Sequence, residues 1–309
     1  MLSTIPQISA TALFDDSHPD NPIALERVRD AAENIGFMTL TGTTITTETI
    51  TRAFDTYHRF FLQPATFKRQ YDMAATGSNR GWGAPGAEQV DPNANPDYKE
   101  VFDSGLELAV DDPLARHTYY APNLWPQRPA RFQSIITDYY QKAAAMSLAL
   151  LSAVAVAIGE PADYFVDKFD KPMALLRGNY YPPRPDRATS KDFGIAPHTD
   201  YGCLTLLATD GSPGLEVKTR NGRWIPITAA PGTFVINFGE MLQMWTRGRV
   251  VATPHRVIGG VSERLSIPFF FNPRYDVNVA PSGSSKLILA GEHLSARYNE
   301  TYLHRQKDR

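Results

Sequence analysis

The chain has 309 residues, which is enough to bury the core of one large domain or of two small ones. Hydrophobic residues make up 42% and charged residues 21% of the sequence, as is ordinary for a soluble globular protein. The formal net charge of −2 gives no field of either sign that would draw the chain to nucleic acid or to a membrane, so we expect neither as a partner.

The cysteine content and the N-terminus bear on the compartment. Cys203 is the only cysteine, so an intramolecular disulfide is excluded, which fits a reducing environment. Residues 1–6 lack a basic region followed by an apolar run, so we expect no secretory signal and a cytoplasmic location. Cys203 itself is predicted to be a small packing residue and not a ligand.

The first half of the sequence reads mostly helical. Apolar positions with helical spacing predict helices over residues 22–34, 49–61 and 131–158. Gly36, Pro64 and Gly159 follow these segments and are expected to end them.

One part of the third helix could be mistaken for a membrane span. Residues 143–158 are almost all apolar, but these sixteen positions fall short of the ~20 that are needed to cross a bilayer. They also continue a polar helical pattern that begins near Phe132. We therefore expect a buried helix of a soluble protein.

Residues 77–96 are rich in Gly, Pro, Asn and Ala and show neither helical nor strand periodicity. A loop of this length inside a compact domain is usually functional or disordered. Arg80, Trp82 and Gln89 lie in it and are unusual side chains for a spacer, so the segment is a candidate lid over a substrate.

The second half changes character. Between residues 173 and 279, short apolar runs rich in Val, Ile, Leu, Phe and Tyr alternate with Gly, Pro and Asn clusters. This pattern is typical of many short antiparallel strands in a sandwich or barrel, and Asn221-Gly222 predicts one hairpin turn. The coarse prediction is a helical N-terminal half packed on a β-rich C-terminal half.

Two imidazoles and a carboxylate form a candidate metal site. His198 and Asp200 are two residues apart, so in an extended chain their side chains point to the same side. His255 lies in another strand-like segment. Two histidines and one carboxylate make the ligand set of non-haem Fe(II) oxygenases, which leaves three positions open, although zinc accepts the same donors.

A second set of residues could bind a carboxylate. Arg264 and Ser266 share one face of a predicted strand, and Asn179 and Tyr181 share a face of an earlier one. An arginine offers a planar fork of donors that suits a carboxylate, and the hydroxyls add further donors. The alternative for Arg264 is a surface ion pair, with Glu263 or Glu240 as the partner.

With these residues in view, the sequence resembles the isopenicillin N synthase-like branch of the Fe(II)/2-oxoglutarate oxygenases over nearly its whole length. The matching motifs are spread along the chain and occur in the family's order. They are Ile5-Pro6-Gln7-Ile8, Asn34-Ile35-Gly36-Phe37, Phe60-Phe61-Leu62-Gln63-Pro64, Asp97-Tyr98-Lys99-Glu100-Val101-Phe102, Asn123-Leu124-Trp125-Pro126, Asn179-Tyr180-Tyr181-Pro182-Pro183, His198-Thr199-Asp200-Tyr201-Gly202, His255-Arg256-Val257 and Arg264-Leu265-Ser266.

The resemblance implies an α+β fold. A mainly helical N-terminal region, residues 1–125, would pack on residues 126–309, a long helix plus a double-stranded β-helix (jelly-roll) core. It implies Fe(II), 2-oxoglutarate and O₂ as cofactor and co-substrates, and oxidation of a C–H bond of a small-molecule substrate, most simply hydroxylation, with release of succinate and CO₂. Two groups of residues would carry the chemistry. The iron ligands would be His198, Asp200 and His255, and the 2-oxoglutarate carboxylate would be held by Arg264, Ser266 and Tyr181, with Asn179 beside them.

Two further segments, Asn79-Arg80-Gly81-Trp82-Gly83-Ala84-Pro85-Gly86 and Gly291-Glu292-His293-Leu294, resemble microbial members of the family, which include pyrimidine hydroxylases and ethylene-forming enzymes. Those members act on different substrates, so this likeness does not identify the substrate. Four residues are assigned to a candidate substrate wall. They are Arg80, Trp82, Gln89 and Phe271. The alternatives are an oxidase of the same family that uses no 2-oxoglutarate, and a non-catalytic jelly-roll that binds a ligand.

Overall fold

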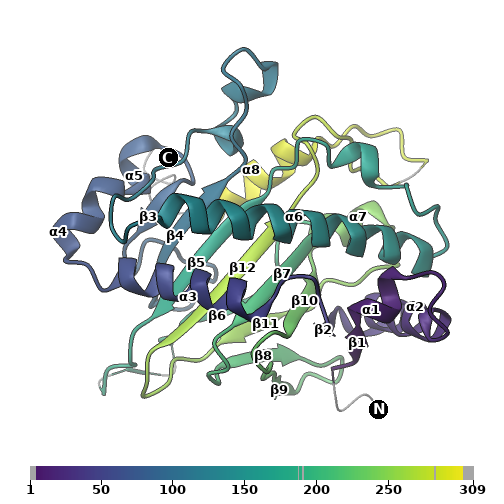
Figure 1. Cartoon of the computed structure of the whole chain (residues 1–309), viewed down its shortest axis with the longest axis horizontal. Helices are drawn as coiled ribbons and strands as arrows, with labels where there is room; N and C mark the ends of the chain where they lie inside the picture. The colour runs from purple at the N-terminus through teal and green to yellow at the C-terminus, as the bar shows by residue number, and fades with distance from the viewer. Residues whose placement is uncertain (1–4, 187, 190, 282, 302–309) are drawn as a thin grey trace.

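Two β-sheets face each other across a cavity, and helices cover the outer face of the larger sheet (Figure 1). The computed structural model describes residues 5–186, 188–189, 191–281 and 283–301. The larger sheet has eight strands in the order β1-β2-β10-β7-β12-β5-β4-β3, and the smaller has four in the order β6-β11-β8-β9. The fold is the expected α+β arrangement around a jelly-roll core.

The strands are short, and all their pairings are antiparallel except that of β1 with β2. In chain order they are β1 (Gln7–Ser9), β2 (Phe37–Thr41), β3 (Gly81–Gly83), β4 (Glu100–Gly105), β5 (Leu175–Tyr181), β6 (Ile195–His198), β7 (Leu204–Thr209), β8 (Leu215–Lys218), β9 (Trp224–Pro226), β10 (Phe234–Phe238), β11 (His255–Val257) and β12 (Arg264–Phe271).

The helices include five short 3-10 or π turns. In chain order they are α1 (Ala10–Phe14), α2 (Asn21–Asp30), η1 (Ala31–Ile35), α3 (Thr47–Phe61), α4 (Ala65–Lys68), η2 (Arg69–Tyr71), α5 (Met73–Thr76), η3 (Pro113–Arg116), η4 (Thr118–Tyr120), α6 (Phe132–Ala157), η5 (Val166–Lys168), α7 (Glu240–Trp245) and α8 (Ala290–Thr301). The three helices predicted from the sequence correspond to α2 with η1, to α3 and to α6.

Strand β12 shows how one sequence serves both the core and the cavity. Its odd-numbered residues Ile267, Phe269 and Phe271 belong to the main hydrophobic core. Helices α3 and α6 pack against β12 on this side and are visible across the sheet in Figure 1. Its even-numbered residues, Arg264 to Phe270, line the cavity on the other side. The two-residue period of a strand therefore separates packing from chemistry.

Gly36 ends the first predicted helix for a steric reason. It has a positive φ of 76° and its amide closes the π turn on the carbonyl of Ala31. A Cβ at this position would lie 2.3 Å from Oγ1 of Thr253, which is two residues before His255. The turn into β2 is thus fixed against the segment that carries a candidate metal ligand.

The N-terminal region contains strands that the sequence analysis did not assign. β1 and β2 extend one edge of the large sheet beside β10, and β4 and β3 extend the other edge beside β5. The region is therefore built into the core sheet as well as packed on it. The boundary at residue 125 stays a prediction, and the predicted turn at Asn221-Gly222 does join β8 to β9, with a φ of 82° at Gly222.

Helix α6 is longer than its apolar part. With 26 residues it is long and apolar enough to cross a bilayer by length and composition, so the length argument from residues 143–158 fails for the whole helix. Half of its most apolar window is buried inside the protein. Its buried side chains, among them Ile136, Tyr139 and Leu150, lie in the main core, as is common for the central helix of a soluble fold.

Candidate active site

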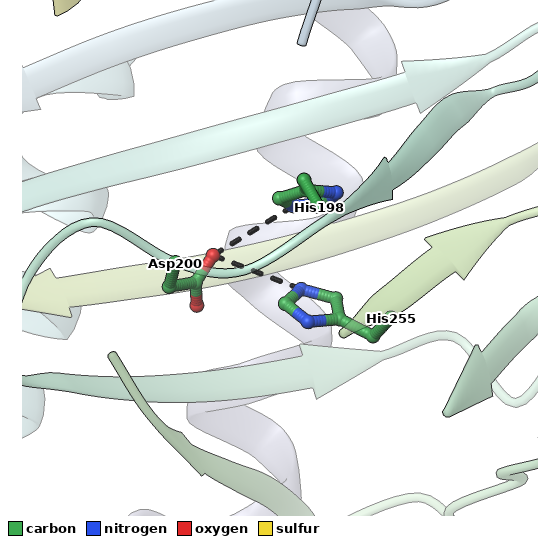
Figure 2. Close-up of side chains that lie close together, drawn as sticks. All are labelled: His198, Asp200 and His255. Carbon is green, nitrogen blue, oxygen red and sulfur yellow. Dashed lines mark ion pairs between the residues drawn. The ribbon is translucent and has the colours of Figure 1, made fainter. Parts of the chain in front are cut away.

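Two histidines and an aspartate converge where the small sheet faces the large one. His198 ends β6 and His255 begins β11, and these two residues are direct partners in the antiparallel pairing of the strands. Asp200 lies two residues beyond β6, and its Oδ1 is 3.7 Å from Nε2 of each histidine (Figure 2). The donor atoms all lie within 4.8 Å of one another, so a single metal ion can contact all three.

Backbone carbonyls orient both imidazole rings. Nδ1 of His198 lies 2.8 Å from the carbonyl oxygen of Ala196, and Nδ1 of His255 lies 3.2 Å from that of Thr253. A proton on each Nδ1 satisfies these carbonyls and leaves Nε2 with its lone pair toward Asp200. Burial and then the neighbouring His255 lower the pKa of His198 to about 3, so its ring is neutral and able to bind a metal.

The carboxylate of Asp200 is held in a similar way. Its Oδ2 accepts hydrogen bonds from Nδ2 of Asn237 at 2.6 Å and from the hydroxyl of Thr205. Burial raises the pKa of Asp200, but the two imidazoles and these two hydrogen bonds lower it by more. The pKa of this carboxyl is therefore below its usual value. Asp200 is therefore ionised, with Oδ1 left to face the histidines.

This donor set fits Fe(II). Two imidazoles and one ionised carboxylate on one side of an ion leave positions for a bidentate 2-oxo acid and for O₂. The ring of Phe37 from β2 packs edge-on against His255, with the ring centres 5.3 Å apart, and holds that imidazole from the side.

The four residues predicted to bind the co-substrate form one block on β12 and β5. Arg264 lies opposite Tyr181 and Ser266 opposite Asn179 in the antiparallel pairing. Nδ2 of Asn179 donates to Oγ of Ser266 at 3.2 Å, and the guanidinium carbon of Arg264 lies 5.0 Å from the centre of the Tyr181 ring. All four line the same cavity as the candidate metal ligands.

Among the residues that the structure describes, no carboxylate contacts Arg264. The residue is 4% exposed, and its Nε and Nη1 are buried without a hydrogen-bond partner among the residues that the structure describes. The alternative of an ion pair with Glu263 or Glu240 is wrong, because Glu263 contacts His58 and Tyr180 while Glu240 contacts Arg297 and Thr199. A buried guanidinium in this state fits the carboxylate of a bound ligand.

Beside this block, the wall of the cavity carries a cluster of buried charges that the sequence analysis did not find. Nζ of Lys99 lies 2.8 Å from both Glu88 and Asp97, and Nη2 of Arg177 lies 2.8 Å from Glu88 and 2.7 Å from Asp103. We call these five residues the charge cluster. The side chains are at most 8% exposed.

The two cations act differently on the three carboxylates of the charge cluster. Burial raises the pKa of Glu88, but Arg177 and Lys99 together outweigh it and lower that pKa to about 2. Asp97 contacts Lys99 and Asp103 contacts Arg177, and burial leaves the pKa of each carboxylate above its usual value. The carboxylate that bridges both cations is thus the most firmly ionised.

Aromatic side chains complete the cavity. Tyr201, from the turn after Asp200, and Phe270 of β12 line it, together with Tyr298 and Thr301 of α8. The hydroxyls of Tyr201 and Thr301 lie 2.5 Å apart, which ties α8 to the turn that carries Asp200. The cavity therefore offers apolar contact surface beside its charged wall.

Two of the residues assigned to the substrate lie beneath the surface of the fold and not in the cavity, which corrects that assignment. Arg80 is buried and donates to the carbonyls of Asn79 and Tyr119. Trp82 lies in β3, where its indole N–H donates to Glu100 at 2.7 Å. Residues 77–96 nonetheless reach the cavity, through Glu88 and Val90.

The other two residues assigned to the substrate, Gln89 and Phe271, lie outside the cavity, although each is next in sequence to a residue that lines it. Gln89 bonds to the carbonyl of Ala94, whereas its neighbours Glu88 and Val90 line the cavity. Phe271 stacks on Phe169 in the core, whereas Phe270 lines the cavity. The period of two from Arg264 already placed position 271 on the core face, so this signal was present in the sequence.

Cys203 is fully buried in the main core, as expected for a packing residue. Burial raises the pKa of its thiol. The side chain is therefore an inert apolar group.

Comparison with known proteins is consistent with this geometry. Residues 172–273 match the model of the 2OG-Fe(II) oxygenase superfamily, and residues 5–128 match that of the N-terminal region of non-haem dioxygenases in morphine synthesis. A 2-oxoglutarate-Fe(II) type oxidoreductase from Aspergillus fumigatus is 32% identical over 260 residues, which is 81% of this chain and 77% of the relative. The chain belongs to the 2-oxoglutarate/Fe(II) oxygenase family.

Other members of the family cover nearly the whole chain. The 2-oxoglutarate-dependent dioxygenase tropC of Talaromyces stipitatus is 31% identical, over 90% of this oxygenase and 88% of the relative. The crystal structure of a full-length Neurospora crassa protein in complex with alpha-KG and thymine superposes with a TM-score of 0.84 at 28% identity, over 96% of each chain. A 2OG-Fe(II) oxygenase family protein from Caulobacter crescentus gives 0.83 at 28% identity, over 96% of this chain and 99% of that one.

The family establishes the class of reaction. The protein is a non-haem Fe(II)- and 2-oxoglutarate-dependent dioxygenase that oxidises a small-molecule substrate, with O₂ as the second co-substrate. The donor set around Asp200 and the buried guanidinium of Arg264 fit these groups on the geometry alone.

Proposed function

We propose that this oxygenase hydroxylates a C–H bond of a small organic molecule that binds between the iron site and the charge cluster. The observation that carries the proposal is the buried guanidinium of Arg264, whose Nε and Nη1 have no partner among the described residues and which lies in the same cavity as the histidines and Asp200. Each residue set then has one role. Fe(II) is held by His198, Asp200 and His255, and the far carboxylate of 2-oxoglutarate by Arg264, Ser266, Tyr181 and Asn179.

The side chains divide the work of positioning. Bound Fe(II) supplies the reduction of O₂ that accompanies conversion of 2-oxoglutarate to succinate and CO₂. Arg264 fixes one end of the co-substrate, while Thr205 and Asn237 keep Oδ1 of Asp200 turned toward the histidines. Tyr201 and Phe270 supply apolar surface that excludes water from the reacting carbon. Of the segment 77–96 that was expected to be a lid, residues 81–83 form β3 of the large sheet. We propose that the part after β3, which brings Glu88 and Val90 to the wall, acts as the lid.

Asp200→Ala tests the metal assignment. The variant keeps two imidazoles but loses the charged ligand, so we expect a folded protein with much weaker Fe(II) binding and no formation of succinate. Asp186→Ala, which removes an exposed carboxylate, is the control and should behave as wild type. Full activity in Asp200→Ala would contradict the assignment.

The second experiment concerns the co-substrate and the product. O₂ uptake and succinate formation are followed with a panel of amino acids, nucleobases and small metabolites, and thymine is included because it is bound in the Neurospora crassa relative. We expect succinate in step with O₂ for the accepted substrate, and a product heavier by one oxygen atom. O₂ uptake without 2-oxoglutarate would favour the oxidase alternative.

We also propose that the protein acts in the cytoplasm, without nucleic-acid or membrane partners. The small net charge and the single, buried Cys203 support this proposal. Cell fractionation with an antibody to the protein tests it, and recovery in a membrane or secreted fraction would contradict it.

A further inference from the structure

One residue, Ala196, connects a buried carboxylate to a candidate iron ligand. Its backbone N–H donates to Oδ1 of Asp97 at 3.2 Å, and its carbonyl accepts from Nδ1 of His198 at 2.8 Å. Ala196 is fully buried in β6 and precedes Pro197, which restricts its backbone to extended conformations. A displacement at its N–H is therefore passed to its carbonyl.

Asp97 is itself held firmly. Its side chain is 1% exposed and its Oδ2 lies 2.8 Å from Nζ of Lys99. Two backbone hydrogen bonds, from Asn95 to the carbonyl of Lys191 and from Tyr98 to that of Phe193, lay this part of the chain along the segment that leads into β6. Both carboxylate oxygens thus accept from a donor, one on β6 and one in the charge cluster.

Among the described residues, His255 has no carboxylate behind the carbonyl that orients its ring. Nδ1 of His255 donates to the carbonyl of Thr253 at the longer distance of 3.2 Å. Within the described part of the chain, no side-chain carboxylate bonds to the backbone of Thr253; the hydroxyl of this residue donates to the carbonyl of Ile35. His198 and His255 are strand partners, but only the carbonyl that orients His198 belongs to a residue whose N–H is bound by a carboxylate in the described structure.

We propose that Asp97 is a positioning residue for the iron site. Its carboxylate fixes Ala196, Ala196 fixes the Nδ1 side of His198, and Nε2 of His198 is thereby directed at the metal. The same carboxylate ties this ligand to Lys99 and Glu88, which line the cavity where substrate binds. The inference rests on the proposed role of His198, and partners that orient a metal-bound histidine are known to tune the site.

Asp97→Asn is the variant that tests the connection. It keeps the size of the side chain, but an NH2 group, which only donates, replaces one of the two carboxylate oxygens. The side chain can then no longer accept at both positions, from Lys99 and from the N–H of Ala196. Asn95→Ala is the matched control, because it lies in the same segment and loses only an exposed hydrogen bond to Asp192. The probe is Co(II) in place of Fe(II), since paramagnetic Co(II) moves the Nδ1–H proton resonances of its histidine ligands far downfield.

Two such exchangeable resonances are expected in wild type, and the one from His255 is identified by its proximity to the ring of Phe37. In Asp97→Asn the His198 resonance should shift and exchange with solvent at least several-fold faster, while the His255 resonance stays. Co(II) affinity should fall by roughly 10-fold or more, as is typical when an outer partner of a ligand is lost. Asn95→Ala should change neither quantity.

The other outcomes are equally informative. Unchanged resonances and affinity in Asp97→Asn would overturn the proposal, and so would equal changes at both histidines, which would indicate general loosening. If Asp97→Asn does not fold, Asp97→Glu keeps the charge and both oxygens with one more methylene, and the same one-sided change at His198 is required of it. Wild-type protein that binds no Co(II) through two histidines would refute the proposed function instead.

Discussion

Two buried arginines line the same cavity and differ in every contact. Nε and Nη2 of Arg177 donate hydrogen bonds to the carboxylate of Asp103, both at 2.7 Å, and Nη1 donates to Glu88. Arg264 has buried Nε and Nη1 atoms with no partner in the described ranges of the chain. Both stand on the cavity face of neighbouring strands, β5 and β12.

The difference separates a structural cation from a binding cation. A buried charge is costly unless it is paired, so an unpaired guanidinium persists only where a ligand supplies the anion or where the rest of the fold tolerates the cost. Arg177 is neutralised within the protein and shapes the wall. Arg264 is available to a carboxylate from outside. Substitution of Arg177 should therefore lower the stability of the fold, whereas substitution of Arg264 should lower the affinity for 2-oxoglutarate.

The largest effect is expected on stability at Arg177. Arg177→Met keeps most of the side-chain volume but leaves Asp103 and Glu88 without their shared cation, which should cost about 3–5 kcal/mol of the free energy of unfolding. Urea unfolding of the metal-free protein measures it. Arg264→Met is the matched control and should cost little, because no partner is left behind. Equal losses in the two variants would remove the distinction.

The next effect is on co-substrate affinity at Arg264. Deleting one partner of a buried charge-assisted pair costs on the order of 2–5 kcal/mol, which is roughly a 30-fold or greater loss of 2-oxoglutarate affinity. Anaerobic titration of the Fe(II) protein, followed by the visible band of the co-substrate complex, measures it in Arg264→Met. Arg264→Lys should recover only part, because an ammonium lacks the planar fork. Unchanged affinity in Arg264→Met would refute its role.

Acid should weaken the Glu88 contacts in the charge cluster. The pKa of Glu88 is lowered from 4.5 to about 2, so its contribution is complete above pH 4.5 and is lost as the pH falls toward 2. A shift of this size corresponds to about 3 kcal/mol. Between pH 6 and pH 3, wild type should lose more of its unfolding free energy than Glu88→Gln. Glu26→Gln, at an exposed position, should follow wild type.

The smallest effect is expected at Trp82. Trp82→Phe removes the indole hydrogen bond to Glu100, but Glu100 keeps its contact with Lys68 at 2.6 Å. A single hydrogen bond to a charged group contributes about 1.5 kcal/mol. Urea unfolding should show this loss, whereas 2-oxoglutarate affinity should not change. A marked change in that affinity would return Trp82 to the active site.

Most residues of the iron and co-substrate sites could be predicted from the sequence, because the spacing of residues along a strand decides which side chains share a face. A spacing of two places His198 beside Asp200 and Arg264 beside Ser266, whichever fold contains the strands. The same rule placed Phe271 on the core face, and its assignment to the substrate wall ignored it. The family resemblance gave Tyr181 and Arg264 a common role, but the pairing of β12 with β5, which brings the two residues opposite each other, came only from the structure.

What the sequence could not show are contacts between distant segments. Glu88 lies in a loop, Lys99 directly before β4 and Arg177 in β5, and no local periodicity connects them. Trp82 in a Gly-rich loop looks the same whether it faces a substrate or Glu100. The sequence analysis ended the first helix at Gly36 but assigned no strand after it, because β2 is short and one of its pairing partners, β10, lies in a distant segment.

The short strands at the edges of the two sheets affect how the protein behaves at high concentration. β1 and β3, at the edges of the large sheet, have three residues each, and β9, at one edge of the small sheet, also has three. Short edge strands present few unpaired backbone groups to the edge of another molecule. Self-association by strand addition is therefore disfavoured, and the concentrated samples that spectroscopy on the Co(II) protein requires should resist amyloid-like aggregation.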